Sequence, residues 1–220
     1  MDQQKLLTIL RQVQSCPTAP FHEYHVRAKL EEMLGGVEGV STRTDTFGNL
    51  LATYQQGALR EGVWVLGAHM DHPGYVRDPE GGDWTFLGGV PQRVLDSGAG
   101  RKEFGDFAMW DLPAFEQEGE KIVSRVCDDL VGCAVIVALF MELAEQGVET
   151  KCHAVFTRGE EVGFWGAIQL AQRWPFQRND VFLSLETSSP TPGVEFGKGP
   201  VVRAGDALSV FDSDTTADLV

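Results

Sequence analysis

Positive charge is scarce in this sequence of 220 residues. Lysine and arginine total 18 against 32 aspartates and glutamates, which leaves a formal net charge of −14 at pH 7. Nucleic acids and anionic membranes both bind proteins through lysine and arginine, so this balance argues against either as a partner. The acidic excess identifies no substrate by itself, although part of it could be carboxylates gathered to hold cations.

Long hydrophobic segments and paired cysteines are also missing. No apolar run reaches transmembrane length, and the longest, Val131 to Met141, is expected to be a core helix. Residues 1–12 carry charges on both sides of a short apolar run and no small-residue cleavage site, so they do not resemble a signal peptide. The four cysteines form no CxxC pair and no disulfide framework, which favours a reducing cytoplasm.

Several catalytic motifs are absent or fail on spacing. There is no GxSxG motif and no arranged Cys–His pair, so covalent catalysis has no candidate. His22-Glu-Tyr-His25 resembles HExxH, but its histidines are three apart instead of four, which favours a solvated helix face. His153 lies among apolar neighbours and is predicted to be a buried structural histidine.

Alternating helix and strand patterns predict an α/β fold with a mixed sheet flanked by helices on both faces. Helical apolar spacing covers residues 4–15, 22–34, about 129–146 and near 164–173. Strand-like runs cover residues 37–43, 50–54, 63–68, 122–126, 152–157 and 181–185. Between residues 73 and 120, glycine clusters separate short aromatic pieces, which indicates a small all-β insertion in a domain formed by 1–72 and 121–220.

Residues able to bind metal follow four of the predicted strands. They are His69, Asp128, the pair Glu160 and Glu161, and Glu186. Because ligands of open α/β sheets bind outside the carboxyl ends of the strands, we expect these side chains to meet at one edge.

Each of these residues also has a structural explanation. Asp128 or Asp129 could cap the following helix, and Glu160 and Glu161 could be acidic residues favoured at a helix start. His69 could be a satisfied core histidine, and Glu186 an ordinary loop carboxylate. Taken one at a time the structural explanations are favoured, but together they require four coincidences.

A shared metal site would explain the histidine and the carboxylates together. Zinc accepts imidazole and carboxylate ligands, and in a two-metal site one carboxylate usually bridges the ions. A metal-bound histidine normally donates its other ring N–H to a carboxylate, for which Asp71 is the natural candidate. Of two adjacent glutamates, one can bind metal while the other acts as the general base.

These residues resemble a known family. Ala68-His-Met-Asp71, then Asp128-Asp129, then Thr157-Arg-Gly-Glu-Glu-Val-Gly163 are similar to the motifs of the co-catalytic zinc exopeptidases, and most similar to the M42 glutamyl and deblocking aminopeptidases. The resemblance covers most of the chain, including Asp45 to Leu50 and Gly197 to Pro200. The ordered combination is fairly specific, whereas HxD alone would be weak.

The resemblance implies a role for each residue. His69 would bind one metal ion with Asp71 orienting it, Asp128 would bridge both ions, and Glu160 would be the general base. Glu161 would bind the second ion and Glu186 the first. The implied cofactors are two divalent ions, zinc with cobalt or manganese as alternatives, and the implied partners are a peptide substrate and further copies of the chain in a homo-oligomer.

Three features depart from the family pattern. The position of Glu186 is usually aspartate, and the insertion at 73–120 is shorter than the family's β subdomain, which helps to build oligomers. The family also supplies a second histidine ligand far downstream, whereas no histidine follows His153. We therefore expect the chain to be C-terminally truncated and its catalytic domain to be incomplete.

The sequence predicts a metal-dependent aminopeptidase that hydrolyses N-terminal peptide bonds with a metal-bridging water activated by Glu160. Two alternatives remain open. One is a metal-dependent amidohydrolase or deacylase acting on N-acyl amino acids or small amides, and the other is a non-catalytic scaffold that retains the fold.

Overall fold

The computed structural model describes residues 1–58, 62–80, 82–90, 92–96, 98–189, 192–206 and 208–220. The chain forms two compact units, Met1–Thr187 and Ser188–Val220. All the residues predicted to form the site belong to the first unit.

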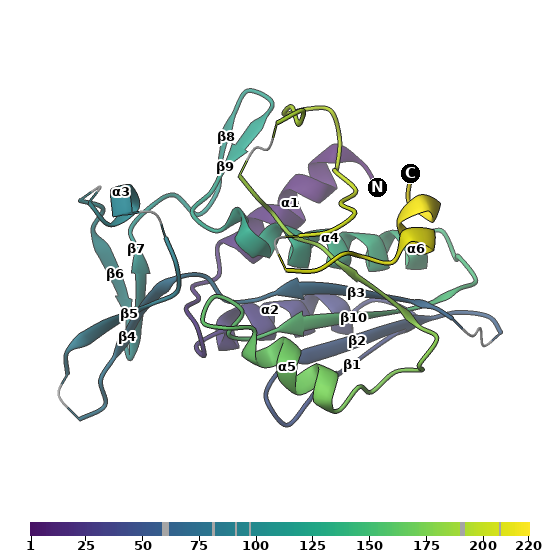
Figure 1. The fold of residues 1–220 in the computed structure, drawn as a ribbon, viewed down its shortest axis with the longest axis horizontal. Helices are drawn as coiled ribbons and strands as arrows, with labels where there is room; N and C mark the ends of the chain where they lie inside the picture. Colours follow the sequence, from purple (N-terminus) through teal and green to yellow (C-terminus); the bar gives the residue numbers. More distant parts are fainter. Residues whose placement is uncertain (59–61, 81, 91, 97, 190–191, 207) are drawn as a thin grey trace. The chain divides into compact units, whose positions relative to one another are not determined.

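The first unit contains both helices and strands, which alternate from α4 onward (Figure 1). The helices are α1 (Gln3–Gln14), α2 (Tyr24–Gly35), α3 (Gln92–Leu95), α4 (Cys127–Glu145) and α5 (Trp165–Gln172). The strands are β1 (Val40–Thr44), β2 (Leu50–Gln55), β3 (Trp64–His69), β4 (Gly74–Arg77), β5 (Trp84–Leu87), β6 (Arg101–Phe104), β7 (Phe107–Trp110), β8 (Glu116–Glu118), β9 (Lys121–Val123), β10 (Lys151–Thr157) and β11 (Val181–Ser184). The predicted helices and most of the predicted strands are confirmed to within a few residues.

The main sheet is mixed and has the order β1-β2-β10-β3-β11. β1 and β10 each pair antiparallel with β2, whereas β3 pairs parallel with both β10 and β11. Thr157, the last residue of β10, lies opposite His69, the last residue of β3. The three parallel strands therefore end at the same edge, where the ligand crevice of such a sheet is expected.

Helices cover both faces of this sheet, as predicted. Alternate residues of β2 face opposite sides: Leu50, Ala52 and Tyr54 join the large core with α1, α2 and α4, and Leu51 joins a smaller cluster that includes Leu170 of α5. In Figure 1, α1 and α4 lie on one side of the sheet and α5 on the other. The apolar run from Val131 to Met141 lies within α4, which explains why that helix is apolar on nearly every side.

The predicted strand at 122–126 is wrong in extent and in partner. β9 ends at Val123, and it pairs with β8 in a separate two-stranded sheet rather than joining the main one. Beyond Val123, the Val126 N–H donates to the Ser124 side chain instead of to a neighbouring strand, and the Arg125 guanidinium donates to Gln14 O and Cys16 O. A local apolar alternation could not reveal these distant acceptors.

The predicted insertion contains a sheet of its own. Its strand order is β5-β4-β7-β6, with antiparallel pairs throughout. The rings of Tyr75, Phe86 and Trp110 contact one another at centroid distances of 5.2 to 6.2 Å, which gives this small sheet an aromatic core. The boundaries 73–120 stay a prediction.

The second unit contains α6 (Ser213–Asp218), whose start is capped by the Asp212 side chain, and an isolated bridge between Gly205 and Val210. Its described residues include no buried side chain. Over the described part of both units, no helix is long and apolar enough to cross a membrane.

Candidate metal centre

His69 is the residue around which the predicted ligands gather. It ends β3 and its side chain is only 2% exposed. Its backbone N–H donates to Asp129 Oδ2 over 3.1 Å, and its ring Nδ1 lies 3.1 Å from the carbonyl oxygen and 3.5 Å from the carboxylate of Asp71. These contacts hold the ring so that Nε2 points toward the remaining carboxylates.

Three carboxylates from different elements surround that Nε2 atom. Asp128 Oδ1 lies 3.0 Å away, Glu186 Oε2 3.8 Å and Glu160 Oε2 3.9 Å. They come from the start of α4, from the residues just after β11 and from the loop that follows β10.

The donor atoms form two overlapping groups that share the histidine. In one group, donor atoms of His69, Glu160 and Glu161 all lie within 4.8 Å of one another; in the other, so do donor atoms of His69, Asp128 and Glu186. The structure therefore brings together all the side chains that the sequence analysis selected as metal ligands.

Asp71 has a different position from the others. It is fully buried, and its two oxygens accept the backbone N–H groups of Glu160 at 3.0 Å and Glu161 at 3.1 Å. Besides the contact with His69, it thus fixes the backbone of both glutamates. Sequence reasoning predicted the contact between Asp71 and His69 but not the contacts between Asp71 and the backbone of the two glutamates.

Asp128 lies on a different element from the one that the sequence predicted. Instead of following a strand, it lies at the start of α4, where Asp128 and Asp129 have non-helical backbone angles and are joined by a cis peptide bond. Asp129 is fully buried and accepts the Gly132 N–H as well as that of His69. The cap interpretation thus describes Asp129, while Asp128 faces Nε2 of His69.

The electrostatics are those of a crowded acidic site. Burial, together with the charges of Asp128 and Glu160, raises the pKa of Glu161 to about 8, and burial also raises the pKa of Glu160 and of Glu186. Burial opposes protonation of His69, but hydrogen bonds that the ring donates to the Asp128 and Asp71 carboxylates outweigh it and raise the pKa of the imidazole. Nearby positive charge would stabilise every carboxylate in this group.

His72 is a further neighbour that sequence reasoning missed. Its ring Nδ1 lies 3.1 Å from the carbonyl oxygen of Asp128, and burial lowers its pKa to about 4. The neutral ring can therefore donate to that carbonyl and hold the backbone of the bridging candidate. No spacing rule marks it, because its partner is a backbone atom 56 residues away.

The other histidines have structural environments. His153 is 7% exposed in β10, with Nδ1 2.8 Å from Thr53 Oγ1, which confirms the predicted buried structural histidine. His22 and His25 both contact the ring of Phe107. Neither joins a metal-type cluster of the described residues.

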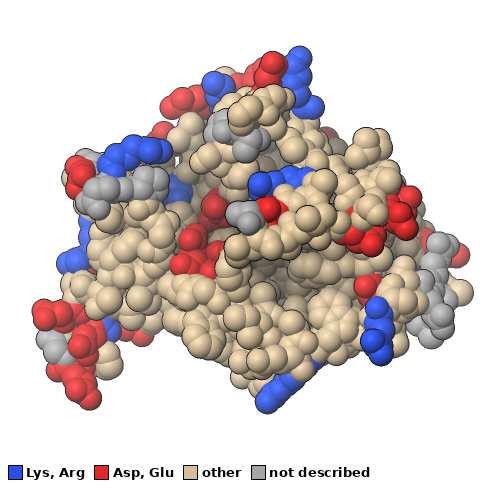
Figure 2. Space-filling model, viewed as in Figure 1, with Lys and Arg blue, Asp and Glu red and all other residues tan. Residues whose placement is uncertain are grey.

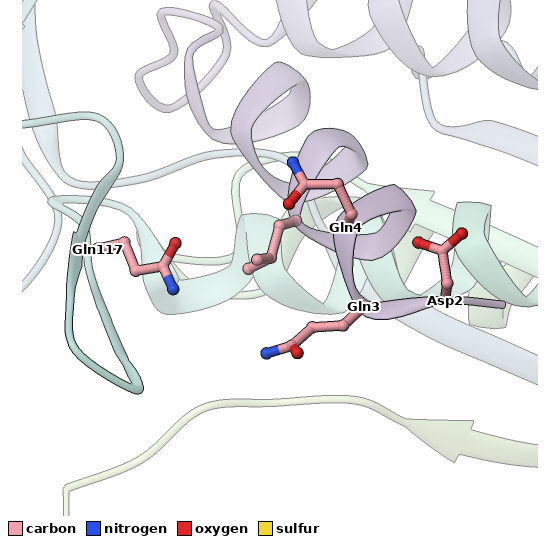
Figure 3. A pocket seen from close by; sticks show the side chains of 5 residues that line it. Asp2, Gln3, Gln4 and Gln117 are labelled. Carbon is pink, nitrogen blue, oxygen red and sulfur yellow. The ribbon is translucent and has the colours of Figure 1, made fainter.

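Two cavities lie away from the acidic cluster. One, of about 500 Å³, is lined by the start of α1 and by Gln117 of β8; Asp2, its one acidic residue, caps the helix by accepting the Lys5 N–H (Figure 3). The other, of about 380 Å³, lies beside β1, β2 and β10 and includes His153. On the face in Figure 2, acidic side chains gather in several groups whereas basic ones are scattered.

The fold and the site together define a class: an α/β protein with a mixed sheet whose parallel strand ends gather one histidine and several carboxylates, as in metal-dependent exopeptidases. The family model of the M42 glutamyl aminopeptidases matches residues 99–220. The chain belongs to this family, and it is a metal-dependent aminopeptidase.

Individual relatives are distant in sequence. A curated protein of Acetivibrio thermocellus named "Putative aminopeptidase" is 24% identical over 255 residues, covering 94% of this chain and 75% of the relative. The solved TET1 peptidase of Pyrococcus horikoshii is 21% identical with a TM-score of 0.77, covering 97% of this chain and 79% of that one. An aminopeptidase of Desulfurococcus kamchatkensis is also 21% identical, with a TM-score of 0.66 and coverage of 89% and 67%. These likenesses confirm the predicted fold class.

Proposed function

We propose that the acidic cluster at the end of β3 hydrolyses N-terminal peptide bonds with two divalent metal ions. His69 and Glu186 would hold one ion, Glu161 the other, and Asp128 would bridge them, with Glu160 as the general base. The observation that carries the proposal is the convergence of these side chains into two groups that share His69, each within 4.8 Å.

The residues present suit divalent ions. Imidazole nitrogen and carboxylate oxygen are ligands that zinc accepts, and cobalt and manganese accept them too. The carboxylates raise one another's pKa, so a cation placed among them would relieve their repulsion. Of the three metals we propose zinc.

The proposed mechanism gives separate roles to the metal ions and to Glu160. When bound, the metal ions would polarise the scissile carbonyl and lower the pKa of a water molecule. Glu160 takes the proton of the attacking water and passes it to the leaving amine. Its carboxylate is suited to this transfer because it faces the cluster and burial raises its pKa from the ordinary value of glutamate.

Assembly and location complete the proposal. One similar solved structure is a dodecamer, and the TET1 peptidase of Pyrococcus horikoshii can assemble into a tetrahedron or a large octahedral shell, which supports a homo-oligomer for this chain as well. The four cysteines are free, which supports the cytoplasm as its compartment.

Replacing the general base tests the mechanism. We expect Glu160→Gln to lower kcat on aminoacyl-anilides by about 10²–10⁴-fold, because the amide cannot accept the proton. Bound metal, measured by elemental analysis, should stay the same, since Glu160 is not a proposed ligand. Glu116→Gln, at an exposed position in β8, is the matched control and should leave both unchanged.

Two results would contradict this mechanism. Undiminished turnover in Glu160→Gln removes the general base assignment. Hydrolysis of N-acyl amino acids in preference to aminoacyl-anilides replaces the aminopeptidase substrate with that of an amidohydrolase.

A further inference from the structure

The loop that carries Glu160 and Glu161 is held by side chains at each of its first four residues. It begins at Arg158, directly after β10, and its backbone N–H groups donate in order to Asn49 Oδ1, Glu23 Oε1, Asp71 Oδ1 and Asp71 Oδ2, at 3.1, 3.1, 3.0 and 3.1 Å. Such consecutive side-chain acceptors replace the backbone partners that a strand or helix would provide.

The three acceptor residues are buried and come from distant segments. Asn49 and Asp71 are fully buried and Glu23 is 1% exposed. Glu23 precedes α2, Asn49 lies between β1 and β2, and Asp71 follows β3. Because a buried N–H that loses its acceptor also loses the compensation for its desolvation, each of these bonds resists opening of the loop.

Glu23 uses both oxygens of its carboxylate. Oε1 accepts from Phe21 N at 2.7 Å as well as from Gly159 N, and Oε2 accepts from Arg158 Nε at 2.6 Å. The remaining guanidinium nitrogens of Arg158 donate to the carbonyl oxygens of Phe47 and Phe21 at 2.8 and 2.6 Å. The buried charge of Glu23 is therefore paired with the Arg158 guanidinium. Two of its three partners, Arg158 and Gly159, belong to the loop.

Asn49 joins the same loop to α5. Its amide nitrogen donates to Asp45 Oδ2 at 2.8 Å and to Gly166 O at 3.0 Å, while its oxygen binds Arg158 N. A Cβ atom at Gly166 would lie 2.4 Å from Asn49 Oδ1 and 2.6 Å from the Arg158 backbone, so only glycine permits this close approach. The start of the loop and the start of α5 are thus fixed to one buried amide.

We infer that Glu23 and Asn49 are positioning residues of the peptidase site, which hold the loop that presents Glu160 and Glu161. The inference rests on the proposed roles of these two glutamates. Neither positioning residue belongs to the two metal-type groups, and both act through the backbone of residues 158 and 159.

Hydrogen exchange tests the anchoring without reference to activity. We expect the amides of residues 158–161 to exchange faster in Glu23→Ala and in Asn49→Ala, while β2 keeps its exchange rate. Glu23→Gln retains an acceptor at Oε1 but loses the ion pair with Arg158, so it should show a smaller increase and serves if the alanine variant does not fold. Unchanged exchange at 158–161 overturns the inference whatever the activity of the variants.

Kinetics tests the consequence for catalysis. We expect each alanine variant to lower kcat by about 10–100-fold, the usual effect of losing a supporting hydrogen bond, with a smaller change in KM. Because both residues hold one loop, the double variant should lose less than the product of the single losses. Glu38→Gln, exposed between α2 and β1, is the control and should match the parent.

The two tests separate the possible failures. Faster exchange with unchanged kcat overturns the positioning role, because an opened loop would then have no effect on catalysis. Faster exchange and lower kcat support it, and they do so even if Glu160→Gln proves active, since that result would concern the identity of the base alone.

Discussion

Single side chains at this site act as much through backbone contacts as through their reactive atoms. Asp71 and Asp129 both point carboxylate oxygens at N–H groups, Asp71 at Glu160 and Glu161 and Asp129 at His69. Both are fully buried, so their bonds are shielded from water. Some acids of the cluster therefore face Nε2 of His69, whereas others hold the backbone of the residues that do so.

His153 shows what burial does to a histidine outside the site. Burial and then the positive charges of Lys151 and Arg43 lower its pKa below the usual value. Below a pH of about 6.5, the unfolded chain therefore binds a proton that the folded chain does not. The contribution of His153 to the free energy of unfolding thus falls as the pH falls through that value.

Urea unfolding at a series of pH values tests this linkage. Between about pH 7 and pH 5, we expect the parent to lose more stability than His153→Gln, which lacks the titrating ring. Equal losses in the two proteins would show that the ring does not titrate differently on folding.

Among the elements, α4 links the core to the candidate site, because it packs against α1, α2 and β3 and carries Asp128 in its first turn. Near its far end lies the Tyr54 hydroxyl, 3.0 Å from Leu143 O in the last turn of the helix and 2.8 Å from Val148 O just beyond it. The helix thus connects the core of the sheet to the candidate metal centre.

Two neighbouring residues of α4 allow a matched stability test. Phe140 is fully buried and packs near Tyr54, whereas the adjacent Leu139 is 38% exposed. We expect Phe140→Ala to lower the free energy of unfolding by about 3–5 kcal/mol and Leu139→Ala to have a much smaller effect. Similar losses in a urea titration would mean that α4 is buried on a different side.

For the molecule as a whole, metal binding and folding should be linked. Only the folded chain brings His69 together with Glu161, Asp128 and Glu186, so ions bind the folded state in preference. At a free zinc concentration 100 times the dissociation constant, the expected stabilisation is about 2.7 kcal/mol.

Thermal unfolding with and without a chelator measures this linkage. Zinc should raise the midpoint of the parent, and a chelator should reverse the rise. Glu186→Gln should show a smaller rise, because it removes one ligand charge. An equal rise in both proteins would place the metal elsewhere, and no rise in either would show that the folded chain binds no zinc.

The linear sequence was enough to predict most of the elements and to select side chains that the fold brings together. Periodicity is local, so α1, α2, α4 and the strands of the main sheet could be found from it, and the placement of His69 and Glu186 after parallel strands indicated a common edge. The order of the motifs along the chain indicated the M42 family. The strand expected at 122–126 was wrong because alternation along the chain does not identify a strand's partner, and β9 pairs with β8 instead of joining the main sheet.

Only the folded structure decided which acidic side chains face Nε2 of His69 and which bind backbone N–H groups. It directs Asp128 toward His69 Nε2 and Asp129 toward the His69 backbone, although the two are neighbours, because the start of α4 is not helical there. It also brings Glu23 and Asn49 to the loop that carries Glu160 and Glu161, although each lies more than 100 residues from the loop residue that it binds. Such contacts depend on how helices and strands pack, and packing distances are not encoded in the spacing of residues along the chain.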